Sequence, residues 1–246
     1  MASRVAQTDA TVLLTGESGV GKEVVARYIH QHSARRHGPF VAINCAAIPD
    51  TLLEATLFGY EKGAFTGAQQ PQAGKFEQAQ DGTLLLDEVT EMPLGLQAKL
   101  LRVLQEREVE RVGGKKPISL NIRIVATSNR DMAEAVARGV FREDLYYRLN
   151  VFPLPIPALR QRADDIVPLA RHFLAVHGGA MGRTGLGLTP GAEAALQAYS
   201  WPGNVRELEN MMQRAVILAP AERVDADSLH LVGAPAAAVA AAAPAA

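Results

Sequence analysis

The sequence predicts an α/β fold in which a parallel sheet is sandwiched by helices, followed by a small C-terminal all-α domain. Short runs rich in Leu and β-branched residues alternate with helical patterns, as they do where parallel strands are joined by right-handed helical crossovers. These runs are hydrophobic almost throughout, because strands covered on both faces must be. After Pro153, Pro155 and Pro157 the strand pattern stops, and only helical patterns follow.

The first part of the chain carries the strands. They are expected at residues 11–15, 41–44, 83–86, 122–127 and 151–154. A helix is expected at residues 94–106, where Leu96, Leu100, Val103 and Leu104 share one apolar face. Residues 1–159 therefore form the expected α/β domain.

The second part of the chain carries helices only. One is expected from Asp164 toward residue 177, one from Thr189 and Pro190 toward residue 199, and one from Asn204 toward residue 218. These define a helical domain at residues 160–231. Residues 232–246 are Ala, Pro and Gly with Val, a composition that indicates a flexible linker.

Composition excludes several classes of protein. The chain has 246 residues, and 25 Lys and Arg stand against 26 Asp and Glu. This balance lacks the basic footprint of a self-sufficient DNA-binding domain, so we expect DNA contact to be indirect or made by a domain missing from this chain. Apart from the alanine-rich tail, which two prolines interrupt, no stretch approaches the roughly 18 apolar residues of a membrane span.

The single cysteine and the N-terminus indicate the compartment. Cys45 has no partner for an internal disulfide, which favours a reducing, cytoplasmic environment. We expect Cys45 to be a small core residue. The N-terminus has no signal-peptide pattern and runs almost at once into a strand-like segment, so we expect the chain to be a piece of a longer protein.

A phosphate-binding loop follows the first expected strand. It fits the pattern G-x-x-x-x-G-K and precedes a helix, which is the context that this motif requires. Glycines let backbone N–H groups converge on phosphates, and the helix N-terminus adds partial positive charge. The lysine can reach the β and γ phosphates of ATP as a point charge. The residues of the loop are Gly16, Glu17, Ser18, Gly19, Val20, Gly21 and Lys22.

The next residue, Glu23, departs from the general pattern. A Ser or Thr hydroxyl usually follows the lysine and binds Mg²⁺. Without it, the metal must rely on other groups or on water.

Two adjacent acids follow the apolar run at residues 84–86. A buried strand that ends in Asp87 and Glu88 delivers both carboxylates beside the phosphate loop. In this position Asp87 is expected to hold Mg²⁺, and Glu88 is expected to polarise the attacking water. The alternative, a pair of solvated loop acids, is less consistent with a strand downstream of a phosphate loop.

A glycine-bounded loop identifies a family. It consists of Gly63, Ala64, Phe65, Thr66, Gly67 and Ala68. Together with GESGVGKE at residues 16–23, NCAA at 44–47, GTLLLDE at 82–88, FREDL at 141–145 and WPGNVREL at 201–208, it resembles the central motor domain of sigma-54-dependent transcription activators, the bacterial enhancer-binding proteins. The resemblance spans residues 5–231, and Glu23 is typical of this family. The sequence around residues 127–130 looks most like flagellar members.

The resemblance implies an AAA+ P-loop NTPase fold with a helical lid and ATP bound between the two domains. It implies a homo-oligomeric ring, a hexamer, that hydrolyses ATP with Mg²⁺. The loop at residues 63–68 would contact sigma-54 of RNA polymerase and drive the closed promoter complex toward the open one. Phe65 suits an anchor in a partner; without the family resemblance, a surface turn with Phe65 in its own core would be the better interpretation.

The resemblance also implies roles for residues around the acids. Asn44 would pair with Glu88 and release it with nucleotide state. The register of ATSN places Ser128 at the first sensor hydroxyl with Asn129 beside it, and Thr127 is a close competitor.

Three arginines match family positions as well. Arg142 and Arg148 match arginines that act on the neighbouring subunit's nucleotide, although structural arginines also occur in such segments and this leaves Arg148 open. Arg206, in the helical domain, matches the second sensor, which contacts nucleotide.

Two other function classes fit less well. An AAA+ loader or helicase acting directly on DNA predicts a basic projecting loop, whereas residues 63–68 are uncharged. A nucleotide-gated scaffold without turnover would not need intact Lys22, Asp87 and Glu88.

Overall fold

The computed structural model describes residues 1–219 and 223–229, which form two compact units. The first unit consists of Met1–Glu17 and Gly21–Ile156. The second consists of Ser18–Val20 together with the chain from Pro157 onward. Three residues of the phosphate loop thus belong to the helical unit.

A five-stranded parallel sheet forms the centre of the first unit, in the order β2-β5-β8-β1-β9. The strands are β1 (Val12–Thr15), β2 (Phe40–Asn44), β5 (Thr83–Asp87), β8 (Arg123–Ser128) and β9 (Phe152–Pro155). All five predicted strands are confirmed within one residue at each end. The prolines of β9 are tolerated because this strand lies at the edge of the sheet.

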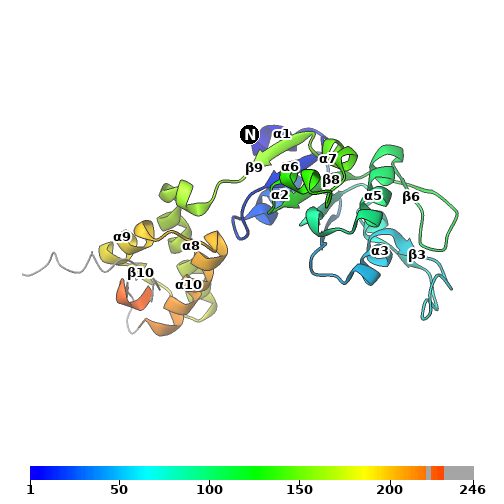
Figure 1. Cartoon of the computed structure of the whole chain (residues 1–246). Helices are drawn as coiled ribbons and strands as arrows, with labels where there is room; N and C mark the ends of the chain where they lie inside the picture. The colour runs from blue at the N-terminus through cyan, green and yellow to red at the C-terminus, as the bar shows by residue number, and fades with distance from the viewer. Residues whose placement is uncertain (220–222, 230–246) are drawn as a thin grey trace, which may run out of the picture. The chain divides into compact units, whose positions relative to one another are not determined.

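Helices cover both faces of the sheet, as predicted (Figure 1). Alternation along the strands separates two cores: Leu13 faces one, and its neighbours Val12 and Leu14 face the other. Helix α5 contributes Leu100 to the first core, and α2 contributes Ile29 to the second. The helices are α1 (Ala2–Ala6), α2 (Lys22–Gln31), α3 (Asp50–Phe58), α4 (Lys75–Gln78), α5 (Leu94–Glu106), α6 (Met132–Ala137) and α7 (Glu143–Leu149). The bounds of α5 match the prediction.

Two small hairpins extend beside α3 and α5 (Figure 1). The sequence indicates the tip of the second hairpin at Lys115 and Lys116, after Gly113 and Gly114, but gives no sign of the first. In the first, β3 (Gly59–Tyr60) pairs with β4 (Gln72–Ala73). In the second, β6 (Glu108–Val109) pairs with β7 (Ile118–Ser119). A bridge between Tyr60 and Val112 joins the two hairpins.

The second unit packs its helices around the buried Trp201. Its helices are α8 (Ile166–Ala180), α9 (Pro190–Ala198) and α10 (Asn204–Leu218), so the three predicted helices are confirmed. The indole N–H of Trp201 donates to the carbonyl of Leu196 at 2.8 Å. Thr189 caps α9, accepting from the N–H of Ala192 at 3.2 Å.

Two details of this unit differ from the prediction. Asp164 does not cap α8, because residues 163–165 form a 3₁₀ turn, η3 (Ala163–Asp165), and Asp165 takes the cap position. The unit also contains strands: β10 (Gly187–Leu188) pairs in parallel with β11 (Arg223–Val224). The linker predicted at residues 232–246 lies outside the described residues. Within them, no helix is long and apolar enough to cross a membrane.

Candidate functional site

The phosphate loop joins β1 to α2 through glycines with positive φ. Gly21 is the N-cap of α2 with φ 99°, and a Cβ there would meet no atom within 4 Å, so its backbone conformation, rather than crowding, favours glycine. Lys22 is 7% exposed and donates to the carbonyl oxygens of Gly16 at 2.7 Å and Glu17 at 3.0 Å. The ammonium is therefore anchored to the loop. Glu23 turns away to an ion pair with Arg27.

The three loop residues that belong to the second unit are held there by side chains. Arg206 Nη1 donates to Ser18 Oγ at 3.2 Å, and Asn204 Nδ2 donates to the carbonyl of Ser18 at 3.1 Å. Arg162 Nη2 donates to the carbonyl of Val20 at 2.7 Å. Arg206 thus contacts a residue of the phosphate loop, as does Arg162. The contact of Arg162 was not indicated by the sequence.

The carboxylate of Asp87 stands at the end of β5, between two strands that each hold one of its oxygens. From β2, Asn44 Nδ2 donates to Oδ2 at 3.0 Å; from β8, Thr127 Oγ1 donates to Oδ1 at 2.5 Å. The register explains both contacts, because Asn44 pairs with Asp87 and Leu86 pairs with Ala126, one residue before Thr127. Three strand ends therefore converge on this carboxylate.

Glu88 leaves the strand in a left-handed conformation, with φ 53° and ψ 51°. Its N–H donates to Thr127 Oγ1 at 2.9 Å, and its Oε1 accepts from Asn129 Nδ2 at 3.4 Å. A non-glycine residue in this region stores strain, which is common at functional sites. The hydroxyl of Thr127 thus holds the carboxylate of one acid and the backbone of the next.

Two contacts in this structure differ from the expected ones. Asn44 pairs with Asp87 and not with Glu88, because its strand register faces Asp87 and its own Oδ1 is held by the N–H groups of Ala46 and Ala47. Ser128 is not the hydroxyl at the acids. Successive strand residues point to opposite faces, and Ser128 Oγ closes a turn with the backbone of Arg130 at 3.0 Å. The competing residue, Thr127, makes the contact.

Cys45 lies next to this edge and is inert. Burial, reinforced by the charges of Asp87 and Glu88, raises the pKa of its thiol to about 12. The thiol therefore stays neutral, and Cys45 belongs to the core of the first unit, as predicted.

The glycine-bounded loop connects β3 to β4. The N–H of Gly63 donates to the carbonyl of Ala68 at 2.8 Å, and the N–H of Ala68 donates to the carbonyl of Phe65 at 3.0 Å. Gly63 and Gly67 have φ of 82° and 102°. Phe65 is 44% exposed and packs edge-on against Tyr60, with ring centroids 4.9 Å apart. The aromatic ring is therefore partly covered by a neighbour but is not in the core.

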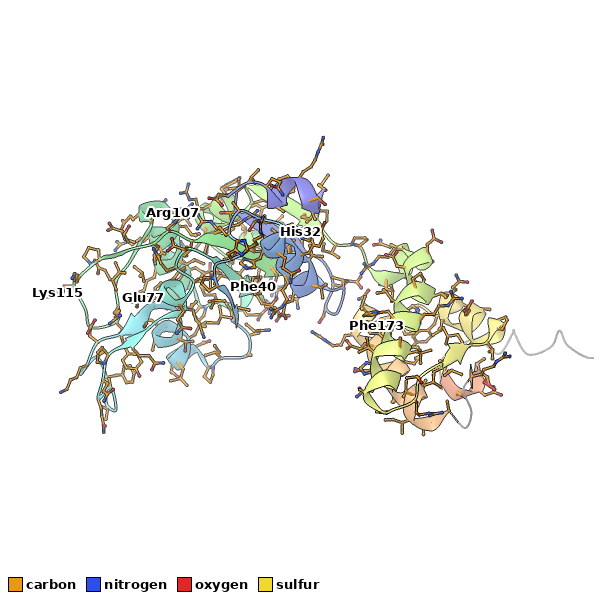
Figure 2. All side chains as sticks on the ribbon, turned by 180° about the vertical axis from the view of Figure 1, so that it is seen from behind. His32, Phe40, Glu77, Arg107, Lys115 and Phe173 are labelled. Carbon is orange, nitrogen blue, oxygen red and sulfur yellow. The ribbon has the colours of Figure 1, made fainter. Side chains whose placement is uncertain are left out.

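An arginine from the second hairpin clamps the base of this loop. Arg111 binds both carboxylate oxygens of Glu77 at 2.9 and 2.7 Å and Glu61 Oε1 at 3.2 Å. Main-chain bonds reinforce the clamp, from Glu61 N to the carbonyl of Val112 and from Val112 N to the carbonyl of Gly59. Figure 2 shows Glu77 near the body of the unit and Lys115 farther out on the second hairpin. The clamp was not predicted.

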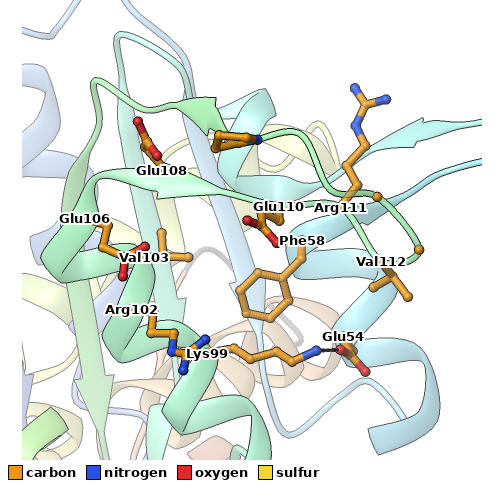
Figure 3. A pocket seen from close by; sticks show the side chains of 13 residues that line it. Glu54, Phe58, Lys99, Arg102, Val103, Glu106, Glu108, Glu110, Arg111 and Val112 are labelled. Atoms are coloured by element: carbon orange, nitrogen blue, oxygen red, sulfur yellow. Dashed lines mark hydrogen bonds and ion pairs between the residues drawn. The ribbon is translucent and has the colours of Figure 1, made fainter.

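A cavity of about 300 Å³ lies beneath the second hairpin, against α3 and α5 (Figure 3). Phe58 and Val103 line it, and an ion pair between Lys99 and Glu54 stands at its margin. No residue of the phosphate loop and neither of the two acids lines it, so this cavity is separate from the acids at the sheet edge.

The two candidate trans-acting arginines lie on and before α7 and differ in their contacts. Arg142 is the N-cap of α7, and its guanidinium, 42% exposed, binds Asp144 through two bonds of 3.0 and 2.6 Å. Arg148 Nη2 donates to the carbonyl of Leu104 in α5 at 2.8 Å. Arg142 thus faces solvent, whereas Arg148 has a structural contact within its own chain. The backbone N–H of Arg142 binds Gln97, a buried residue that the sequence signalled only as a polar position on an apolar helix face.

Comparison with known proteins adds to this geometry. The family described as the Sigma-54 interaction domain matches residues 1–155, and the AAA+ ATPase lid domain matches residues 160–242. The response regulator protein FleR of Pseudomonas aeruginosa is 64% identical over 218 residues, which are 89% of this chain and 46% of FleR. The transcriptional regulatory protein FlbD of Caulobacter vibrioides is 54% identical over 231 residues, 94% of this chain and 51% of FlbD. The chain spans about half the length of these two relatives.

A solved structure shares the fold over most of the chain. NtrX from Brucella abortus in complex with ATP is 42% identical with a TM-score of 0.85, over 92% of this chain and 50% of that one. The same protein in complex with ADP gives the same identity and TM-score.

Proposed function

This chain belongs to the sigma-54 interaction domain family of AAA+ ATPases, and on that premise we propose that it is the ATP-hydrolysing motor domain of a transcription activator. In this proposal the motor remodels the sigma-54 RNA polymerase at closed promoter complexes so that they can open. The observation that carries the proposal is the pair of acids at the end of β5, fixed by Asn44 and Thr127, in the same unit as the exposed loop at residues 63–68. The structures of the similar protein NtrX in complex with ATP and with ADP support the proposal that this chain binds ATP.

The phosphate loop would bind the nucleotide. Backbone N–H groups of residues 16–22 and the N-terminus of α2 favour phosphate, and Lys22 would exchange its carbonyl contacts for phosphate oxygens. Arg206, which already contacts Ser18 within the second unit, would act as the second sensor of the nucleotide.

Asp87 would hold Mg²⁺. Each of its carboxylate oxygens accepts one side-chain hydrogen bond, which leaves each with a further lone pair. Mg²⁺ keeps several waters and takes one or two carboxylates together with substrate phosphates. A single carboxylate beside a phosphate loop fits that donor set, and Glu23, paired with Arg27, is not needed in it. When bound, the metal would neutralise charge on the β and γ phosphates.

Glu88 would act on water. It would orient the attacking water and accept its proton as the bond between the γ phosphorus and the bridging oxygen breaks, giving ADP and phosphate. Thr127 fixes the backbone from which Glu88 extends, and Asn129 stands near its carboxylate. Asn44 and Thr127 would act by holding Asp87, while Ser128 would shape the turn that leads to Asn129.

Arg142 would complete the neighbouring subunit's site. A guanidinium supplied in trans neutralises charge that develops on the transferred phosphoryl group. Its exposure and its position at the start of α7 suit that role, whereas Arg148 would support it through α5. Hydrolysis would then require a homo-oligomeric ring, a hexamer as expected from the family resemblance.

The loop at residues 63–68 would contact sigma-54. Phe65 supplies exposed aromatic surface of the kind that anchors interfaces, and Thr66 offers a hydroxyl beside it. The glycines that turn this loop allow it to change shape with nucleotide state.

The test is size-exclusion chromatography with light scattering, on the chain mixed with purified sigma-54. Runs compare no nucleotide, ADP, and ADP with aluminium fluoride, a transition-state mimic. We expect a ring-sized complex that retains sigma-54 only with the mimic. Phe65→Ala should abolish retention while the ring persists.

The control is Met181→Ala, which removes a similarly exposed hydrophobic side chain, 46% against 44%, from the second unit. This variant should retain sigma-54 as the wild type does. A ring that forms with the mimic but never holds sigma-54 would preserve the ATPase proposal and overturn the partner.

A further inference from the structure

Gln97 is a polar residue on the buried face of α5. It is 0% exposed and shares that face with Leu100 and Leu104. Its amide donates from Nε2 to the carbonyls of Met92 at 2.7 Å and Val140 at 3.0 Å, and its Oε1 accepts from the N–H of Arg142 at 2.8 Å. Three main-chain groups from two segments therefore converge on one buried side chain, an arrangement that specifies geometry rather than merely filling space.

The two segments that Gln97 joins belong to different parts of the proposed reaction. Met92 ends the short 3₁₀ helix η1 (Val89–Glu91), which begins directly after Glu88. Val140 and Arg142 lie in the connection between α6 and α7, and Arg142 is the N-cap residue of α7. One amide thus links the segment that carries the cis acid to the segment that carries the trans arginine.

We propose that Gln97 is a positioning residue that fixes the main chain from which Arg142 reaches the neighbouring subunit's nucleotide. This inference rests on the proposed function, since it assumes that Arg142 acts in trans. The N–H of Arg142 is held directly, one residue from the start of α7, so the Cα position and the exit direction of the side chain are set by this bond. A displacement of about 1 Å at a reacting group can cost on the order of 100-fold in rate.

The bond to Met92 offers the rival interpretation, in which Gln97 acts on Glu88 of its own subunit. The two interpretations differ in which subunit loses activity. If Gln97 acts on Arg142, its loss leaves the variant subunit's own nucleotide site intact. A correctly held arginine from a neighbouring subunit can then complete that site. A defect on the Glu88 side cannot be repaired by any neighbour.

The experiment is an in-trans complementation of ATPase activity with the full chain. Gln97→Leu, Arg142→Ala and Glu88→Gln are each assayed alone and then in equimolar pairs. Glu88→Gln keeps Arg142 but does not hydrolyse, so it donates an arginine to a variant neighbour. With random mixing around a ring, about one interface in four pairs a competent site with a competent donor.

We expect Gln97→Leu alone to lose kcat by about tenfold or more with the KM for ATP nearly unchanged. Mixed with Glu88→Gln, it should recover as much turnover as Arg142→Ala does in the same mixture. Recovery by Arg142→Ala but not by Gln97→Leu would overturn the inference and leave the proposed function standing. If Arg142→Ala itself does not recover, the trans role of Arg142 fails, and the inference fails with it.

Two further variants keep the outcome interpretable. Gln105→Leu changes an exposed glutamine of the same helix and should match the wild type. If Gln97→Leu does not fold, as judged by thermal unfolding, Gln97→Glu takes its place in the mixtures. When the carboxyl of this variant is protonated, it can accept from the N–H of Arg142 and donate one hydrogen bond. The ATPase activity of Gln97→Glu relative to the wild type should therefore rise as pH falls. A relative activity that does not change with pH, together with no recovery in trans, would contradict the proposal.

Discussion

The carboxyl edge of the central sheet and the pair of hairpins belong to the same unit but are built in opposite ways. At the edge, a side chain from each neighbouring strand holds one oxygen of Asp87, and each of the three strands pairs over four or more residues. The hairpins have strands of two residues, and the loop at residues 63–68 is turned by glycines. The reaction proposed for the edge needs fixed atoms, whereas the loop proposed to contact sigma-54 needs freedom to change shape.

One arginine makes the main side-chain contacts between the two hairpins and the rest of the unit. Arg111, in the second hairpin, binds Glu61 in the first hairpin and Glu77 in α4, and a few main-chain bonds and short strand pairs reinforce these contacts. Local stability therefore differs within one unit. Several strand pairs and side chains hold the carboxyl edge of the sheet, whereas the side-chain contacts of the hairpins depend on Arg111. Variants at the edge should change turnover, and variants at the clamp should change stability and leave turnover alone.

The largest effect is expected at Glu88. Glu88→Gln removes the carboxylate proposed as the base without changing the shape of the side chain, so kcat should fall about 10²- to 10⁴-fold, while the Kd of a fluorescent ATP analogue should stay the same. Glu91→Gln, on the same segment but paired with Arg130, is the matched control and should lose little. Equal losses in both variants would mean that the segment, rather than the Glu88 carboxylate, limits turnover.

A smaller loss is expected at Thr127. Thr127→Val keeps the shape but removes the hydroxyl, leaving the N–H of Glu88 and Oδ1 of Asp87 without that partner. Losing a buried hydrogen-bond partner costs about 1–3 kcal/mol, and we expect kcat to fall by about tenfold or more. Steady-state ATPase assays compare Thr127→Ser, which keeps the hydroxyl and should retain most activity, with Ser128→Ala, which should also be mild. If Ser128→Ala lost much activity and Thr127→Val lost little, Ser128 rather than Thr127 would be the first sensor.

The sequence predicted the edge more completely than the hairpins, for a physical reason. Strands buried on both faces leave continuous apolar runs, and the phosphate loop and acids occur at fixed places around them, so residues 16–22, Asp87 and Glu88 could be found. Which hydroxyl meets Asp87 depends on strand register, and a shift of one residue exchanges Thr127 for Ser128. That register was not readable from one sequence.

The first hairpin, the clamp and Gln97 were missed because their signals are weak or non-local. Two-residue strands have no measurable alternation, and the clamp pairs Arg111 with a carboxylate 34 residues away in sequence. Gln97 did leave a trace, since it falls on the apolar face of residues 94–106 with Leu100 and Leu104. A polar residue on such a face predicts a buried hydrogen-bond network, although not its partners.

The smallest effect is expected at Glu77. The two bonds from Arg111 hold the pKa of this carboxyl below its ordinary value of 4.5, so its charge stabilises the folded state. A lowered folded-state pKa contributes stability that is present above the unfolded value and is lost as pH falls through the folded one. Glu77→Gln should therefore reduce the free energy of unfolding by about 1 kcal/mol at neutral pH. Urea unfolding at decreasing pH should show the difference from wild type shrinking below about pH 4.5.

The same variant decides whether the two regions are independent. ATPase activity of Glu77→Gln should match the wild type, because no bond of the clamp reaches Asp87, Thr127 or Glu88. Glu61→Gln, which removes the charge from the single longer bond to Arg111 at a more exposed carboxylate, should cost less stability and serves as the control. If Glu77→Gln lowered turnover as far as Thr127→Val, the clamp would support the proposed catalytic edge, and the loop proposed to contact sigma-54 would be coupled to hydrolysis through Arg111 rather than independent of it.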